Sequence, residues 1–149
     1  MSYAAGETLA LTVLQSVTGF ASTNTSRGKW GILNSGASDH YGILKPGAFE
    51  RTQGAMSMNI STFQTIVQVW QRYKDDGDTL TSLEAHVDNI LAAFDAKRKI
   101  GDTTGTIVDA FMGEGREVTE RWAKDGALAW LSQDLVLTWQ EHNNVTYSE

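Results

Sequence analysis

Hydrophobic residues recur at helical spacing in two stretches of this chain. The first stretch lies near the N-terminus and ends close to Gly19, a residue type that often follows the last turn of a helix. The second is followed by Gly101, and Lys97, Arg98 and Lys99 are expected in its last turn. Each pattern predicts a helix with one buried face. The residues on these faces are Leu9, Val13, Leu14, Val17 and Phe20 in the first helix, and Leu80, Leu83, Val87, Ile90, Leu91 and Phe94 in the second.

Three aspartates and a glycine precede the second helix, at residues 75–78. Such a cluster has three interpretations: a metal site, a group of catalytic acids, or the start of a helix. A calcium loop needs oxygen ligands at alternating positions and a glutamate at position twelve, and this spacing is absent. Thr81 with Glu84 resembles a capping box, and Asp78 or Thr79 offers another cap. The cluster is therefore predicted to leave a strand and begin a helix.

Residues 61–73 alternate between two faces for long enough to predict a strand. Phe63, Val67 and Val69 share the more apolar face. The other face is mixed and carries Gln64, Ile66, Gln68, Trp70 and Arg72.

A hairpin is predicted at the end of the chain. Residues 116–123 alternate, and an Asp-Gly pair at 125–126 signals a tight turn. Residues 128–142 then return as a second strand, and the four-residue step from Leu131 to Leu135 on its apolar face leaves room for a bulge.

The remaining segments are short or weakly patterned. Residues 29–33 and 40–47 are apolar runs of strand length, and the Pro-Gly pair at 46–47 signals a turn that ends the second run. Residues 46–60 and 101–116 show no clean period and are predicted to be loops.

Helix, strands, helix and hairpin in this order predict an α+β fold. We expect a mainly antiparallel β-sheet with two α-helices packed on one face, formed by residues 1–149 as a single domain. Hydrophobic residues make up 41% of the chain and charged residues 20%, which suits a globular domain and argues against long disordered regions.

Charge and composition exclude several classes of protein. Lys and Arg number 12 against 18 Asp and Glu, and a net charge of −6 argues against holding nucleic acid through its phosphates. The absence of cysteine excludes disulfides and thiolate metal sites. The N-terminal segment carries Glu7 and no positive stretch, so it is predicted to be a mature helix and not a signal peptide. No apolar run is long enough to cross a membrane, and no membrane partner is expected.

No residues are predicted to be catalytic, to bind a cofactor or to hold a metal. His40, His86 and His142 lack the spacing of a zinc site. Ser38, Asp39 and His40 are not expected to form a triad, because three consecutive side chains cannot be aimed at one another as a triad requires.

Two weaker patterns also have structural interpretations. Residues 113–118 begin like a dinucleotide fingerprint but lack its third glycine and continue with strand-like alternation. Trp30 beside Lys29, and Trp70 near Arg72, are candidates for stacking single-stranded nucleic acid. Because the chain is acidic and has no basic cluster, the tryptophans are interpreted as anchors of the core or of an interface.

The order of these segments resembles that of the tail terminator, or tail completion, proteins of long-tailed bacteriophages. The resemblance covers most of the chain and rests on the N-terminal helix, on HYGILKPG, on STFQTIVQVWQRY joined through KDDGD to TLTSLEAHVDNILAAFD, and on the final LAWLSQDLVLTWQE.

The resemblance implies a structural protein of the virion and not an enzyme. Members of the family form a hexameric ring on the end of the tail tube, stop growth of the tube and present a surface to the head connector. The expected partners are further copies of the chain, the tail tube protein and the connector or stopper protein, in the neck of a virion assembled in the host cytoplasm. DNA is expected to pass through the channel without specific binding, which an acidic chain suits.

The two predicted loops are expected to contact the tube or a neighbouring subunit, through adaptable apolar residues among others. Packing of the same apolar residues within the monomer is the alternative. The candidate interface residues are Phe49, Arg51, Met56, Met58, Phe111, Met112, Glu114 and Arg116.

Two other functions stay open. The first is another neck component of the head–tail junction, such as a stopper or an adaptor. The second is a cytoplasmic small-molecule-binding or hydrolytic α+β domain, which requires a pocket with convergent polar groups.

Overall fold

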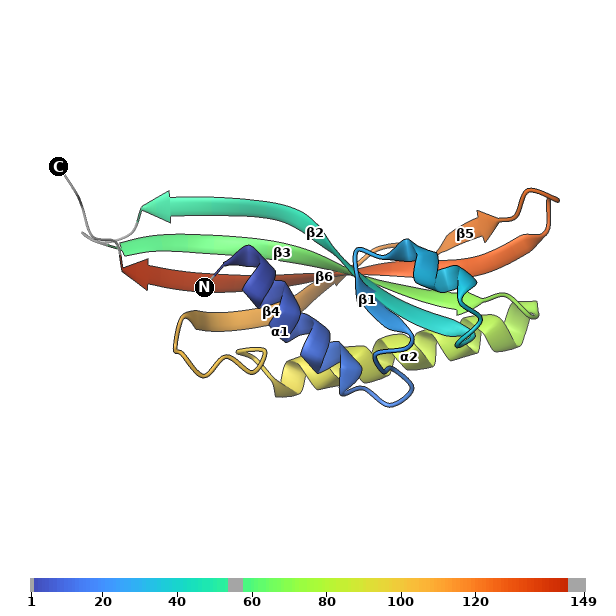
Figure 1. The fold of residues 1–149 in the computed structure, drawn as a ribbon, viewed down its shortest axis with the longest axis horizontal. Helices are drawn as coiled ribbons and strands as arrows, with labels where there is room; N and C mark the ends of the chain where they lie inside the picture. The colour runs from blue at the N-terminus through green and yellow to red at the C-terminus, as the bar shows by residue number, and fades with distance from the viewer. Residues whose placement is uncertain (1, 54–57, 145–149) are drawn as a thin grey trace.

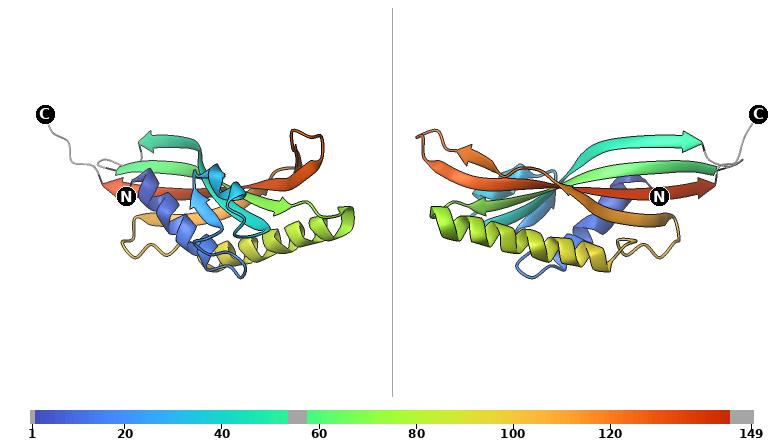
Figure 2. Two further views of the ribbon diagram at one scale, coloured as in Figure 1. Left: turned by 45° about the vertical axis from the view of Figure 1, so that its right-hand side comes forward. Right: turned by 180° about the vertical axis from the view of Figure 1, so that it is seen from behind.

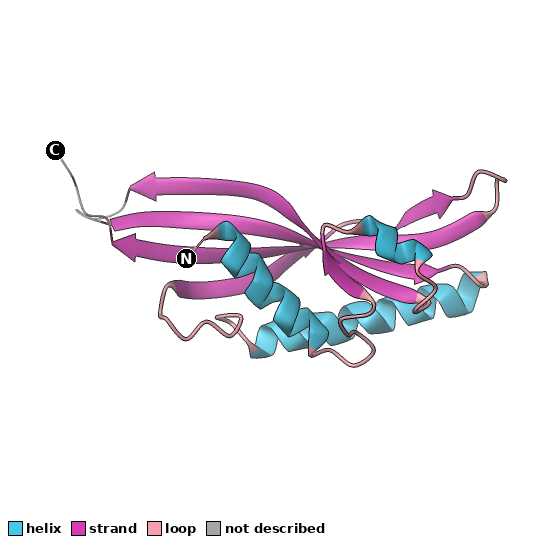
Figure 3. Ribbon diagram, viewed as in Figure 1, coloured by secondary structure: helices cyan, strands magenta, loops and turns pink. Residues whose placement is uncertain are grey.

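The computed structural model describes residues 2–53 and 58–144. Within these residues a six-stranded sheet carries two α-helices on one face, so the predicted α+β fold is confirmed (Figures 1 and 3). The elements in chain order are α1 (Tyr3–Gln15), β1 (Thr25–Arg27), the 3-10 helix η1 (Trp30–Asn34), β2 (His40–Gln53), β3 (Met58–Arg72), α2 (Asp76–Ala96), β4 (Ile107–Gly115), β5 (Thr119–Trp122) and β6 (Leu128–Asn144).

The strands are arranged in the order β1-β2-β3-β6-β4, and β5 also pairs with β6. Every pairing is antiparallel except that of β1 with β2. β4 pairs with residues 135–141 of β6, and β5 pairs with residues 128–132. These two strands therefore form one interrupted edge along β6, opposite the edge formed by β2.

The long strands extend past the helices at one end of the molecule. There, residues 46–53 of β2, 58–65 of β3 and 137–144 of β6 lie side by side, with β4 next to β6. We call this part of the sheet the tip half. Figures 1 and 2 show that its strands continue beyond the N-terminus of α1.

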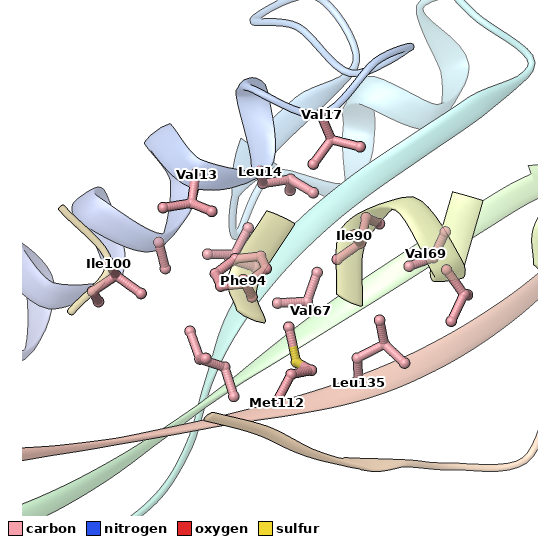
Figure 4. Close-up of a cluster of buried hydrophobic side chains, with 14 of the residues drawn as sticks. Val13, Leu14, Val17, Val67, Val69, Ile90, Phe94, Ile100, Met112 and Leu135 are labelled. Atoms are coloured by element: carbon pink, nitrogen blue, oxygen red, sulfur yellow. The ribbon is translucent and has the colours of Figure 1, made fainter. Parts of the chain in front are cut away.

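The main core lies between the two helices and the sheet. Leu14 of α1 and Phe94 of α2 meet strand residues such as Val67 (Figure 4). Burial of these side chains supplies most of the driving force for folding. A smaller cluster of Tyr41, Ile43 and Trp70 lies on the opposite face, where η1 covers it.

The second helix begins where the aspartate cluster stands, as predicted. Asp75 is the N-cap residue, and its carboxylate accepts a hydrogen bond from the Asp78 backbone N–H at 2.7 Å. The predicted capping box of Thr81 and Glu84 is wrong, and so is the alternative cap at Asp78 or Thr79, because these residues lie inside the helix. Helix α2 ends at Ala96, so the three basic residues expected in its last turn follow it instead.

Residues 29–33, predicted to be a strand, belong largely to η1. Trp30 donates its indole N–H to Gln68 Oε1 at 2.7 Å, and Ile32 and Leu33 pack on the smaller cluster. The apolar residues of this run therefore cover a sheet face instead of pairing at its edge.

Pro46 and Gly47 lie inside β2 and do not form the predicted turn. The register of β2 against β3 shifts between Pro46 and Phe49, and the Tyr3 hydroxyl accepts a hydrogen bond from Gly47 N at 3.0 Å. Proline is tolerated here because the outer side of β2 is an edge, where its missing N–H leaves no ladder bond unmade.

Both segments predicted to be loops contain strand. The first, residues 46–60, supplies the end of β2 and the start of β3, with residues 54–57 outside the described part. The second, residues 101–116, contains β4. A register shift between Ile107 and Asp109 puts Ile107 out of the two-residue period of the later buried side chains, so the strand shows no regular alternation. These buried residues are Ile107, Ala110 and Met112.

The predicted terminal hairpin is confirmed, with Gly126 at φ 86° in its turn. The bulge suggested between Leu131 and Leu135 is absent from the pairing of β6 with β3, which runs without a shift. Gln133 occupies the intervening position and donates its side-chain N–H to Arg116 O at 2.9 Å.

The close approach of α1 to the sheet gives a stability prediction. A Cβ atom added at Gly6 would lie 2.6 Å from Cζ2 of the fully buried Trp139. We expect Gly6→Ala to lower the free energy of unfolding by about 1–3 kcal/mol in urea titrations followed by circular dichroism. Gly77→Ala, at an open helical site, is the control and should be neutral or stabilising by up to about 1 kcal/mol. Equal effects of the two substitutions would contradict the close contact.

Candidate interaction surfaces

Both outer edges of the tip half are unpaired among the described residues. β1 pairs only with residues 42–44 of β2, which leaves the rest of that strand with a free side. β4 pairs with β6 on one side and with no described strand on the other. A free strand edge carries N–H and C=O groups ready to pair with another chain.

The two free edges run in opposite directions. β2, β3, β6 and β4 are neighbours in this order, and each pairing is antiparallel. β2 therefore runs parallel to β6 and antiparallel to β4. Two copies placed side by side in the same orientation present β4 of one copy to β2 of the next in antiparallel sense.

An exposed aromatic side chain lies on each edge strand. Phe49 on β2 is 63% exposed, and Phe111 on β4 is 49% exposed. Arg98 stacks on the Phe111 ring at 5.0 Å and makes two hydrogen bonds to the Asp109 carboxylate, at 2.9 and 2.8 Å. The pKa of Asp109 is lowered by this contact. Large exposed aromatics beside arginine are typical of protein interfaces.

The predicted interface residues separate into two groups on opposite edges. Phe49 and Arg51 are exposed on β2, and Met58 is half-buried at the start of β3. On the other edge Phe111 and Glu114 are exposed on β4. Arg116, exposed just after β4, has its Nε 4.0 Å from a carboxylate oxygen of Glu114.

Two of the predicted residues do not contribute to these surfaces as expected. Met56 lies outside the described residues. Met112 is buried in the main core (Figure 4), so for this residue the alternative of packing within the monomer is correct.

The uncovered face of the tip half was not predicted from the sequence, because residues 46–60 show no clean period. Cross-strand pairing places three rows of side chains on the face away from α1 and α2. The rows themselves contain no lysine or arginine, and the Arg98 guanidinium lies at their β4 end, on Asp109 and Phe111. The three rows are Glu50, Thr62, Gln140 and Asp109; Gln64, Thr138 and Phe111; and Thr52, Ile60 and His142.

Of the two tryptophans considered for nucleic-acid stacking, Trp30 is 41% exposed and bonds to Gln68 through its indole N–H, whereas Trp70 packs within the protein. Trp70 is buried, and the Arg121 guanidinium lies 5.3 Å from its ring centroid. Arg72 lies 4.6 Å from the ring centroid of Trp130 in the same way. Trp122, in contrast, is 60% exposed on β5, at the end of the sheet away from the tip half.

Ser38, Asp39 and His40 contact one another, contrary to expectation, but not as a triad. Ser38 Oγ and Asp39 Oδ1 approach the same ring nitrogen, His40 Nδ1, at 3.3 and 2.7 Å. In a triad the nucleophile and the acid bind opposite nitrogens. Here the other nitrogen, Nε2, lies 2.6 Å from Gly19 O, so this histidine connects the turn after α1 to the start of β2.

His86 stacks on His40 with 4.2 Å between ring centroids, and burial lowers the pKa of His86. Across the described residues no three His, Cys, Asp or Glu side chains come together in a way that could hold a metal ion. The helices of the described part are too short or too polar to span a lipid bilayer.

The Asp39 carboxylate gives a pH prediction. Hydrogen bonds from Lys74, at 2.9 Å, and from His40 lower the pKa of Asp39 from 3.8 to about 2. The ionised group therefore stabilises the fold above pH 3.8, and this contribution is lost as the pH falls toward 2. Solvent screens the partly exposed pair, so we expect Asp39→Asn to lower the free energy of unfolding by at most about 1 kcal/mol at pH 6.

Urea titrations at intervals between pH 6 and pH 2 measure this difference, which should shrink as the pH falls below 4. Asp88→Asn, on the exposed side of α2, is the matched control. A difference between wild type and Asp39→Asn that stays constant with pH would show that the ion pair does not stabilise the fold.

The sequence matches no model of a protein family. It also matches no curated protein. Its function must therefore be inferred from its own fold and surfaces.

Proposed function

We propose that this protein is a structural component of a bacteriophage virion that forms a ring at the head-proximal end of the tail tube. The ring ends polymerisation of the tube and provides the surface that joins the head connector. The sequence resemblance to tail terminator proteins suggests six subunits in the ring. The proposal assigns no catalytic step, cofactor or metal to the chain.

The observation that carries the proposal is the pair of free sheet edges with opposite direction. A contact between two different patches of identical subunits is heterologous, and it closes into a ring when its rotation returns to the start. Antiparallel pairing of β4 of one copy with β2 of the next copy is such a contact. The right-handed twist between neighbouring strands supplies a rotation from one copy to the next.

The uncovered face of the tip half suits the inside of such a ring. Its three rows contribute no lysine or arginine of their own, Arg98 is paired with Asp109 at their β4 end, and the chain as a whole carries −6. DNA is held in proteins mainly by lysine and arginine at its phosphates. A channel lined by this face lets DNA pass without adhesion, while α1 and α2 remain on the outside.

Edge variants test the heterologous ring. Phe49→Lys alters the β2 edge, and Phe111→Lys alters the β4 edge. Wild-type protein, alone or on purified tail tubes, is expected to form rings, and each variant is expected to lose them because a buried unpaired charge is unfavourable. Light scattering after size exclusion and negative-stain images measure this. Leu80→Lys, on the exposed part of α2, is the control and should still form rings.

A mixture of the two edge variants gives a sharper result. Phe49→Lys keeps an intact β4 edge, and Phe111→Lys keeps an intact β2 edge. These two edges can pair with each other once, and the altered edges that remain cannot bind a further copy. A dimer containing one copy of each variant is therefore expected, with no ring. Rings in the mixture, or rings formed by either variant alone, would exclude the edge contact.

Particles assembled without this protein test its place in the virion. We expect overlong or unattached tails in electron micrographs, because nothing ends the tube or joins it to the head. Normal particles would be incompatible with a terminator.

A further inference from the structure

A small pocket opens on the helix-bearing face of the tip half, where the N-terminus of α1 meets the sheet. Its volume is about 310 Å³, at the lower limit for ligand sites, which suits one side chain better than a larger molecule. Tyr3 of α1 and Phe49 and Phe63 of β2 and β3 line it. Glu141 of β6 also lines it, between Ser61 and Ile107 in the cross-strand row.

The Glu141 carboxylate is incompletely satisfied. The residue is 1% exposed, and its Oε1 accepts a hydrogen bond from the Trp139 indole N–H at 3.4 Å. Its Oε2 is buried and has no hydrogen-bond partner among the described residues. A buried carboxylate oxygen without a donor is unfavourable, so a donor group that enters the pocket gains more than it would on an open surface.

The walls of the pocket are suited to a cation. Tyr3 and Phe63 lie with ring centroids 4.7 Å apart, and Phe49 lies 6.3 Å from Phe63. Aromatic faces attract ammonium and guanidinium groups, and carboxylate oxygens accept strong hydrogen bonds from both.

Among the described residues, Arg51 at the rim is the one other charged residue that lines the pocket. It forms no ion pair with Glu141 within 4.0 Å. It is exposed and free to turn toward solvent when a second cation arrives.

A source of that cation lies on the opposite edge of the same molecule. Residues 97–99 follow α2 and are exposed, and Arg98 ties them to β4 through Asp109. Lys97 and Lys99 form no ion pair among the described residues.

The pocket and the basic segment at residues 97–99 also lie at similar positions along the direction of the strands. Asp109 lies in the same cross-strand row as Glu50, which is next to Arg51 at the pocket. A copy placed edge to edge in the same orientation, without a shift along the strands, brings its residues 97–99 to the level of the pocket of its neighbour.

We propose that this pocket is a receptor for a lysine side chain, and that Lys97 or Lys99 of the next copy occupies it. The inference rests on the edge-to-edge ring proposed above and names the polar contact that fixes its register. The ammonium group binds beside Glu141, and its methylene stem lies against Phe49 and Phe63.

A peptide titration tests the pocket without requiring a ring. The probe is the blocked peptide DAKRKIG, residues 95–101 of this chain, and the readout is the indole N–H resonance of Trp139, which bonds to Glu141. We expect a saturable shift of this resonance that is lost when both lysines of the peptide are replaced by glutamine. Because the altered peptide requires no change in the protein, this comparison holds even if pocket variants fold poorly.

Three protein variants locate the binding. Glu141→Gln should weaken the peptide about tenfold or more, because a charge-assisted bond becomes a neutral one. Glu50→Gln, whose side chain faces the other side of β2, is the matched control and should bind like wild type. Arg51→Gln should bind equally or more tightly, since a like charge is removed from the rim. Absence of a Trp139 shift, or a shift that Glu141→Gln leaves unchanged, would overturn the proposal.

Ring assembly separates this inference from the proposed function. Glu141→Gln and the double variant Lys97→Gln with Lys99→Gln are expected to raise the concentration needed for rings about tenfold. Lys124→Gln, in the turn before β6, is the control. Rings that form equally well with Glu141→Gln would refute the lysine contact and leave the terminator function standing. A wild-type chain that forms no rings would refute the proposed function, while the peptide titration still decides the pocket.

Discussion

The antiparallel pairing of β3 with β6 is the interaction on which the rest of the structure depends. All 15 residues of β3 pair with β6 without a register shift. A one-residue slip would turn every side chain of one strand to the other face. The fixed register places Val67, Leu135 and Trp139 under the helices, and it places the polar residues of the tip half on the uncovered face.

The length of this pair also determines which edges stay free. The two helices pack mainly over the middle and the far end of the sheet (Figure 1). They do not cover the outer sides of β2 and β4 in the tip half, so these two edges stay free. Four neighbouring antiparallel strands end in edges of opposite direction. An odd number would give edges of the same direction, and copies in one orientation could then pair only in parallel. The strand count therefore favours a head-to-tail antiparallel contact between copies.

The sequence predicted those elements whose period is uninterrupted. Phe63, Val67 and Val69 keep a strict two-residue alternation, and the apolar residues of α2 keep helical spacing, so both elements were predicted correctly. β4 was missed because the register shift between Ile107 and Asp109 puts Ala110 and Met112 out of phase with Ile107. The run at residues 29–33 was misassigned because four or five apolar residues fit either a strand edge or a short helix. The two segments that hold the predicted interface residues do supply the free edges of β2 and β4, and their role as an interface stays a prediction. The residues next to Glu141 in the sequence do not predict its burial, because this burial depends on α1, β3 and β4 meeting around it.

The irregularities of the two edges also bear on specificity. Free edges are a hazard, and proteins protect them with bulges, prolines and charged residues. β2 has Pro46 and a register shift beside it, and β4 has two shifts and an exposed Asp109 held by Arg98. A regular strand from another protein cannot follow such edges for long. A copy of this chain brings, on its opposite edge, a basic segment that suits the carboxylate below the β2 side. In the proposed ring, bulges that reject unrelated strands and a charge contact that only the matching edge supplies would together limit the contact to copies of this chain, while both edges stay exposed in the free subunit.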